Sequence, residues 1–198
     1  MQIPIFPLNG AVLFPNTYLP LNIFEERYIE MVDYSLANKR LIGMIQYGEN
    51  GHLFDVGCVG KITSFSETTD GRYIINLEGK YCFSKIQEVK GNYKFRLVKA
   101  EILKNQKKPN RDILDDFKTK LLEKFKNYIS IKEIDLSLSE IKKLEADQLA
   151  KFIAMTSPFE NLEKQMLLEI KTFEDFCNKL LSILEIYLVE TNKERIIN

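Results

Sequence analysis

The sequence predicts an α+β protein with a β-rich N-terminal half and an all-helical C-terminal half. Short apolar segments separated by Pro, Asn and Gly fill the chain to about residue 104. The polar stretch Lys104–Asn110 follows. Beyond it, the spacing of apolar residues changes from two to about 3.6, the period of an α-helix. We therefore expect two domains, residues 1–104 and 110–198, joined by Lys104–Asn110 as a linker.

The expected strands are short and rich in β-branched and aromatic residues. They are Ile3–Leu8, Ala11–Phe14, Tyr18–Phe24, Leu41–Tyr47, Val59–Ser66, Arg72–Leu77, Tyr81–Val89 and Tyr93–Leu103. Two connections predict hairpins, because Gly48–Gly51 contains an Asn-Gly pair and Thr69–Gly71 contains an Asp-Gly pair. Strands this short and closely spaced favour a barrel or a sandwich.

One helix is expected to interrupt these strands. Asn22 and Glu25 have the spacing of a capping pair. Apolar residues then recur every three or four positions, at Tyr28, Met31, Val32 and Leu36. We expect this apolar face to close one end of the barrel.

The C-terminal half contains four expected helical segments. Asn110 is placed to cap the first of them, and Thr172 with Asp175 forms a capping pair for the last. The apolar stripes are Ile113, Leu114, Phe117, Leu121, Leu122, Phe125, Tyr128 and Ile129; then Ile141, Leu144, Leu149, Phe152 and Ile153; then residues from Phe159 to Ile170; and last Phe176, Leu180, Leu181, Leu184, Tyr187 and Leu188. Four segments with short connections predict a small helical bundle.

The first 24 residues carry no charge, which raises the question of a membrane span or a signal peptide. Four prolines in this segment would break a helix, and the first basic residue is Arg27, too late for the basic start of a signal peptide. We expect extended chain in a folded protein, and no membrane partner.

The charge balance and the cysteines exclude further classes. Lys plus Arg and Asp plus Glu number 28 each; 11 basic and 10 acidic residues precede position 101, leaving 17 and 18 after it, so neither half is a polycation that would favour nucleic acid. Cys58, Cys82 and Cys177 are far apart in sequence and form no CxxC pattern. This disfavours a disulfide framework or a zinc site and favours small buried residues in a reducing cytoplasm.

No catalytic constellation is present in the sequence. His52 is the single histidine and lies beside a turn, where a solvated side chain is expected. The patterns GxxxxGK[ST], GxGxxG, HExxH and GxSxG are missing. The acidic pairs Glu25-Glu26, Asp115-Asp116 and Glu174-Asp175 are interpreted as solvated helix faces, and the basic residues Lys104, Lys107, Lys108 and Arg111 as solvation of the linker. We expect no enzyme, no cofactor and no metal.

Several motifs together resemble the N-terminal domain of Lon proteases. The opening Ile5-Phe6-Pro7-Leu8, the Val12-Leu13-Phe14-Pro15 that follows, and the segment from Leu19 to Met31, LPLNIFEERYIEM, are similar to that family's FPL, VLFP and LPLxIFExRYxxM. Later segments agree in order: Asp55–Gly60, Thr69–Tyr73, Leu77–Gly79, Leu149-Ala150 and Glu163–Glu169. The resemblance spans nearly the whole chain, and its first block is the most specific.

Two departures from the family pattern stand out. Cys82-Phe83 occupies the place of the family's usual arginine-phenylalanine pair, and Phe176-Cys177-Asn178 lacks an arginine that the family usually carries in its last helix. The prolines and glycines of the motifs have structural roles, because proline fixes φ and glycine permits tight backbone. We therefore interpret the signature as specifying the fold and not a contact surface.

The resemblance implies a PUA-like β pseudo-barrel with one helix, followed by a helical domain. In Lon proteases this part recognises unfolded or tagged substrates ahead of an ATPase and a serine-lysine protease. Neither the ATPase nor the protease domain fits within this chain. Its polar end, Glu190–Arg195, resembles a natural terminus, so a stand-alone form is expected.

Two functions remain open at this point. The first is a non-catalytic protein-binding module that takes up exposed or unfolded polypeptide, as an adaptor or chaperone-like factor working with a protease or a chaperone. The second is an RNA-binding PUA-like protein, which the balanced charge disfavours. A cleft between the two halves, together with loops at one end of the barrel, is the expected binding place, because clefts between domains are favoured sites. No individual binding residue is predicted.

Overall fold

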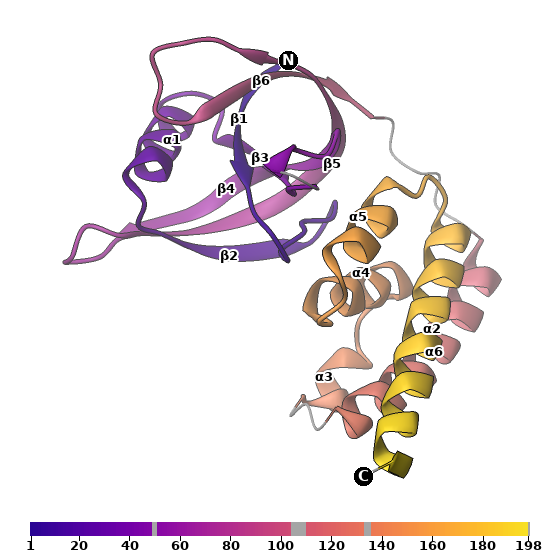
Figure 1. Ribbon diagram of the computed structural model, residues 1–198. Coiled ribbons are helices and arrows are strands. Elements are labelled where there is room, and N and C mark those ends of the chain that lie inside the picture. The colour runs from indigo at the N-terminus through magenta and orange to yellow at the C-terminus, as the bar shows by residue number, and fades with distance from the viewer. Residues whose placement is uncertain (49–50, 104–109, 133–135, 198) are drawn as a thin grey trace. The chain divides into compact units, whose positions relative to one another are not determined.

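The computed structural model describes residues 1–48, 51–103, 110–132 and 136–197 (Figure 1). Residues 190–197 are described by their backbone alone. The chain divides into two compact units. Unit 1 comprises Met1–Asn105 and Glu160–Leu168, and unit 2 comprises Gln106–Phe159 and Glu169–Asn198. The predicted α+β class, with strands first and helices after, is confirmed. The predicted boundaries of 1–104 and 110–198 differ from this division in that residues 160–168 belong to unit 1.

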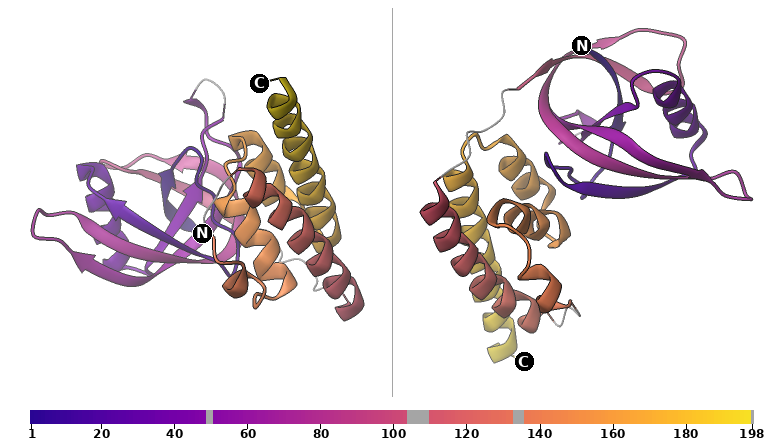
Figure 2. Two further views of the ribbon diagram at one scale, coloured as in Figure 1. Left: turned by 90° about the horizontal axis from the view of Figure 1, so that it is seen from below. Right: turned by 180° about the vertical axis from the view of Figure 1, so that it is seen from behind.

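The strands of unit 1 form a single curved sheet. They are β1 (Gln2–Pro7), β2 (Tyr18–Ile23), β3 (Leu41–Ile45), β4 (Val56–Glu67), β5 (Tyr73–Val89) and β6 (Arg96–Ile102). Their order is β2-β5-β4-β3-β1-β6, and only β1 and β3 are parallel. The long β5 pairs with β2 in its first part and with β6 in its second, so the sheet closes on itself and leaves β2 at an edge (Figure 2).

Two strand predictions need correction. Arg72–Leu77 and Tyr81–Val89 are parts of one strand, β5, which continues through Gly79. Ala11–Phe14 is not a strand: its residues Val12–Phe14 are buried, and Leu13 lies over Gly60 and Gly79. The segment is apolar because it covers this part of the sheet, which periodicity alone does not distinguish from strand pairing.

The two hairpin predictions have different outcomes. The turn after β4 is confirmed, because the Thr68 amide donates to the Arg72 carbonyl at 2.8 Å and Gly71 has φ of 80°. At the other hairpin, Tyr47 forms a bridge with Leu53, and the tip, Glu49-Asn50, lies outside the described residues. The predicted linker also lies outside them over residues 104–109.

Helix α1 (Glu26–Ala37) begins later than the sequence predicted. Asn22 is not its cap, since this residue lies in β2 opposite Ile74. Glu25 occupies the cap position without a side-chain cap bond, and its carboxylate pairs with Arg27 at 2.7 Å instead. The helix buries its apolar face against β1 and β3, with the Phe6 and Tyr28 rings 4.3 Å apart.

Unit 2 is built from helices. They are α2 (Arg111–Ile131), α3 (Leu138–Ile141), α4 (Ala146–Thr156) and α6 (Phe173–Ile197), and α2, α4 and α6 pack against one another. The second predicted helical segment is two helices, α3 and α4. Asn110 holds the cap position of α2 without a side-chain cap bond. Among the described residues, no helix is both long and apolar enough to span a membrane.

Helix α5 (Asn161–Glu169) is attached to the barrel by buried polar side chains. The Gln165 side-chain amide donates to the Val56 carbonyl at 3.0 Å, and the Gln46 amide donates to Gln165 Oε1 at 3.1 Å. Lys164 Nζ donates to the Gly10 carbonyl at 2.9 Å, and burial lowers the pKa of this amine. Burying such groups costs free energy unless they are hydrogen-bonded, so these bonds specify where α5 docks.

The predicted cap of the last helix is confirmed and can be tested. The Asp175 amide donates to Thr172 Oγ1 at 3.1 Å. We expect Thr172→Ala to lower the free energy of unfolding by about 1 kcal/mol in urea denaturation, because the orphaned amide loses its acceptor. Thr156→Ala is the matched control, since that hydroxyl only bonds back to the Phe152 carbonyl of its own helix. Equal effects of the two changes would contradict the capping role.

Candidate functional site

The edge strand β2 presents apolar side chains to solvent. Along the motif from Leu19 to Phe24 the side chains alternate, with Leu19 and Leu21 half-buried and Ile23 buried. The alternate positions point outward: Tyr18, at the start of β2, is 58% exposed, and Phe24, directly after β2, is 69% exposed. Exposed aromatic residues at alternate positions of an edge strand are uncommon, because an edge is usually made polar to prevent aggregation.

The register of β2 on β5 joins these residues into a stripe. Pro20 lies opposite Asn76, and Asn22 lies opposite Ile74. Ile74, which is 47% exposed, is therefore diagonal to Pro20 and close to the position where Phe24 leaves the strand. Diagonal neighbours in a sheet are about 7–8 Å apart, within reach of large side chains. We call Tyr18, Pro20, Phe24 and Ile74 the outer-face patch.

The backbone edge of β2 is poorly suited to strand addition. The Gly79 amide donates to the Thr17 carbonyl at 2.9 Å, which makes odd-numbered β2 residues the ones bonded to β5. The backbone groups of Tyr18, Pro20 and Asn22 consequently face away from β5. Proline has no amide hydrogen, so an added strand would lose a bond in the middle of this edge. The side chains of the patch, and not its backbone, are the better binding groups.

Several charged residues around the patch are paired with one another. Glu78 forms an ion pair with Lys80 at 2.6 Å, and Glu25 forms one with Arg27. In the adjacent hairpin turn, hydrogen bonds from Arg72 and Thr68 lower the pKa of the Asp70 carboxyl to about 2. Because the charges are balanced in pairs, the patch offers apolar contact without a strong field of either sign.

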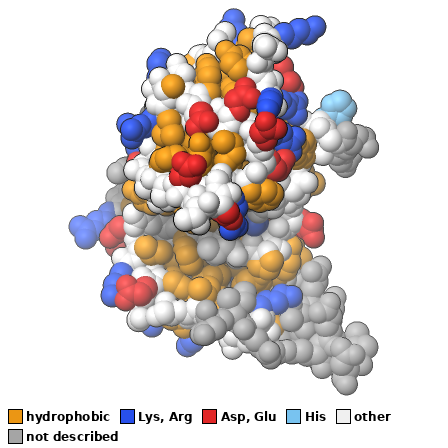
Figure 3. All heavy atoms as spheres, turned by 90° about the vertical axis from the view of Figure 1, so that its left-hand side faces the viewer, with side chains coloured by type: hydrophobic (Ala, Val, Ile, Leu, Met, Phe, Trp, Pro, Cys, Tyr) orange, Lys and Arg blue, Asp and Glu red, His pale blue; other side chains and the backbone are white. Residues whose placement is uncertain are grey.

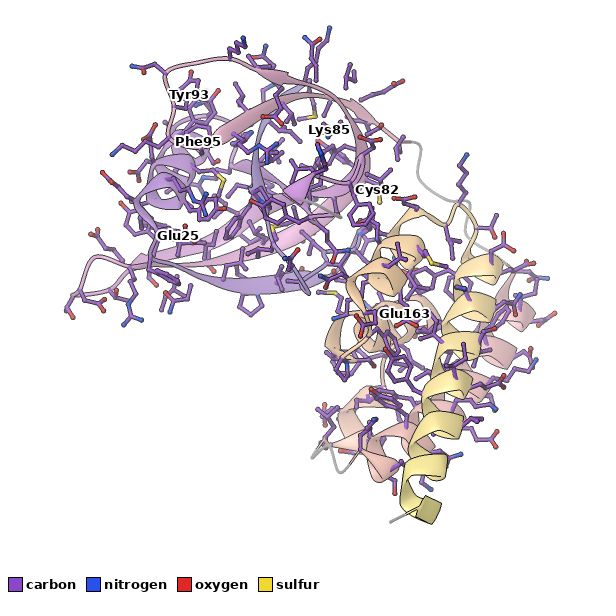
Figure 4. All side chains as sticks on the ribbon, viewed as in Figure 1. Glu25, Cys82, Lys85, Tyr93, Phe95 and Glu163 are labelled. Atoms are coloured by element: carbon purple, nitrogen blue, oxygen red, sulfur yellow. The ribbon has the colours of Figure 1, made fainter. Side chains whose placement is uncertain are left out.

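A second group of aromatic side chains lies beside α1. The rings of Tyr34, Tyr93 and Phe95 are 4.9–5.4 Å apart, and Tyr93 is 43% exposed (Figure 4). The acidic residues Glu26 and Glu30 of α1 both bond to Lys94, which lies between Tyr93 and Phe95 in the sequence. Figure 3 shows hydrophobic side chains interspersed with both acidic and basic ones on the face of unit 1 seen there. Stacking of nucleic acid bases here would bring phosphates close to carboxylates, which is unfavourable.

The residues considered for chemistry do not converge. His52 is exposed, as expected. Of the acidic pairs, Asp116 bonds to Lys120 at 2.6 Å and Asp175 takes part in the cap of α6. Within the described ranges, no three His, Cys, Asp or Glu side chains are arranged to hold a metal ion.

From the sequence alone, the signature indicates the fold and no individual binding residue. Leu19, Leu21 and Ile23 support that interpretation, because their side chains turn toward the protein. Pro20 and Phe24 belong to the same signature but are exposed. The alternation contained part of the information: Tyr18, Pro20 and Phe24 are apolar at outward positions, and Asn22 is the polar exception among them.

Comparison with known proteins places the chain near one family. The model of the "ATP-dependent protease La (LON) substrate-binding domain" matches residues 2–185. The Lon protease of Buchnera aphidicola subsp. Acyrthosiphon pisum is 27% identical over 199 residues, covering 93% of this chain and 25% of the relative. That of Escherichia coli strain K12 is 24% identical over 197 residues, with the same coverage. The chain therefore spans about a quarter of the length of these relatives.

Two solved structures have the same fold. The N-terminal domain of a Mycobacterium avium complex Lon protease superposes with a TM-score of 0.69 at 14% identity, covering 96% of this chain and 98% of that one. A Lon N-terminal domain protein from Xanthomonas campestris superposes with a TM-score of 0.64 at 19% identity, covering 92% and 98%.

Proposed function

Because the chain belongs to the Lon substrate-binding domain family, we propose that it is a non-catalytic module that binds exposed apolar segments of unfolded or flexible proteins. Its role is that of an adaptor or chaperone-like factor, working with a protease or a chaperone in the cytoplasm. The observation that carries the proposal is the outer-face patch. An unfolded chain offers apolar side chains without a fixed shape, and an exposed apolar patch that contains one polar residue, Asn22, can contact many of them.

Binding to such a surface is expected to be weak. Burying the exposed part of a large apolar side chain contributes about 1–2 kcal/mol. Ordering a flexible segment offsets much of this gain, which places the dissociation constant on the order of micromolar. Since the contacts are apolar, the affinity changes little between low and high salt, whereas affinity for RNA falls steeply as salt rises.

A titration tests the proposal. The full chain is added to a fluorescent, permanently unfolded model protein and, separately, to single-stranded RNA, each at two salt concentrations and read by anisotropy. We expect saturable, salt-insensitive binding of the unfolded protein, which stays intact throughout. Salt-sensitive binding of RNA without a response to unfolded protein would replace this function by the RNA-binding alternative.

The site is tested by substitution. A double variant, Phe24→Ser with Ile74→Ser, removes two members of the outer-face patch, and we expect its dissociation constant to rise about tenfold or more. Ile102→Ser is the matched control, because Ile102 is 49% exposed in the same unit but lies on β6. Equal loss in both variants, or none in the first, would show that the patch is not the binding surface.

A further inference from the structure

Cys58 and Cys82, which are distant in sequence, face each other across two neighbouring strands. They are direct partners in the antiparallel pairing of β4 with β5. Directly opposite residues in such a pair project to the same side of the sheet. Cys58 is buried and Cys82 is partly exposed. The two cysteines are therefore neighbours in the sheet although the sequence contains no CxxC pattern.

The hydrogen bonds around the pair show which kind of position it occupies. The Lys85 amide donates to the Asp55 carbonyl at 2.7 Å, so Asp55 and Lys85 form a hydrogen-bonded pair between the strands. Such pairs alternate along an antiparallel ladder, which makes Cys58 and Cys82 a non-hydrogen-bonded pair. Consistent with this, the Cys82 carbonyl accepts from the Leu103 amide, on the side of β5 away from β4.

Non-hydrogen-bonded positions bring opposite residues closest together. Their Cα atoms are about 4.5 Å apart, which lies within the range of about 4.4–6.8 Å found across disulfides. Both strands are tied to neighbours on their other sides, β4 to β3 and β5 to β6. The pairing of the two strands is therefore compatible with a disulfide at these positions without backbone movement.

We propose that Cys58 and Cys82 form a reversible cross-strand disulfide when the protein meets a peroxide. The partly exposed Cys82 thiol takes up one oxygen atom from hydrogen peroxide, giving a sulfenic acid and water. The Cys58 sulfur then attacks the Cys82 sulfur; the S–S bond forms, the S–O bond breaks, and the hydroxyl leaves with the Cys58 proton as a second water. Thiol reductants of the cytoplasm reverse the reaction by exchange.

The third cysteine does not compete for this chemistry. Cys177 lies in α6, in unit 2, and is buried. Burial raises the pKa of its thiol to about 12, so the reactive thiolate is not formed at neutral pH. We therefore expect peroxide to react at Cys82 and not at Cys177, because Cys82 is the partly exposed thiol.

Peptide mapping of the full chain tests the proposal. After brief treatment with stoichiometric hydrogen peroxide, we expect the intact mass of the chain to be about 2 Da lower. The remaining thiols are then alkylated under denaturing conditions. Digestion should give one cross-linked peptide containing Cys58 and Cys82, with Cys177 alkylated. A reductant should restore alkylation at all three cysteines.

Variants separate the proposed steps. In Cys58→Ala we expect Cys82 to be trapped as a sulfenic acid that reacts with a dimedone probe, because its resolving thiol is missing. Cys177→Ala, the control, should still form the cross-link. Labelling of Cys82 by dimedone in the unmodified chain to the same extent as in Cys58→Ala, or over-oxidation of Cys82 without a cross-link, would overturn the proposal.

Discussion

A Gly79→Ala variant is expected to lose about 3 kcal/mol or more of the free energy of unfolding, because the added methyl group has no space. A Cβ atom at Gly79 would lie 2.0 Å from the carbonyl oxygen of Phe14 and 2.8 Å from its carbonyl carbon. Both are backbone atoms, and hydrogen bonds tie this segment to Gly79 itself: the Asn16 amide donates to the Gly79 carbonyl at 2.8 Å. The clash can be relieved only by separating Phe14 from β5.

The measurement is urea denaturation of the full chain, followed by a signal from unit 1. Gly71→Ala is the control, since Gly71 has φ of +80° and no atom lies within 4 Å of its added Cβ. That change introduces only the backbone strain of a left-handed residue, about 1 kcal/mol. If Gly79→Ala lowers the free energy of unfolding by no more than Gly71→Ala does, Phe14 does not approach β5 as closely as described.

A Gln165→Leu variant is expected to lower the free energy of unfolding by about 2–3 kcal/mol, because leucine fits the volume but not the hydrogen bonds. The Val56 carbonyl would lose its donor from α5, and the Gln46 amide would lose one of two acceptors, keeping the Asn161 carbonyl at 3.2 Å. Gln46 and Gln165 are 2% and 1% exposed, so water does not readily replace these bonds.

Hydrogen exchange locates the effect of this variant. We expect faster exchange of the α5 amides and unchanged exchange in α2 and α4, since the lost bonds hold α5 to the barrel. Met166→Leu, at the neighbouring exposed position, should change the stability by less than about 0.5 kcal/mol. An unaltered α5 in Gln165→Leu would mean that apolar packing alone holds this helix in place.

Much of the fold could be predicted because it depends on interactions between residues close in sequence. The change in apolar period near residue 104 separates strands from helices, and the Thr172–Asp175 cap forms within one turn. The start of α1 was misplaced by the same reasoning, because Asn22 has the spacing of a cap but pairs with Ile74 in β5. Local spacing does not distinguish between these two uses of one residue.

The candidate site was less accessible to sequence reasoning. The signature containing Pro20 and Phe24 can be recognised in the sequence. That Ile74 lies beside these residues follows only from the register of β2 on β5. In the sequence, Phe24 and Ile74 are separated by one helix and two strands. Register depends on many weak interactions along both strands, and no single residue pattern specifies it.

By itself, the sequence determined the α+β class, the succession of most strands and helices, the confirmed cap of α6 and the family resemblance. Only the tertiary structure decided that residues 160–168 belong with the barrel, that Ala11–Phe14 covers the sheet, and that Cys58 faces Cys82. The physical reason is the sequence separation of the interacting residues. Period and capping act over a few residues, whereas the bond between Gln46 and Gln165 joins groups 119 positions apart. Such a bond forms only after the chain has folded, because local patterns contain no record of which distant partner will satisfy a buried polar group.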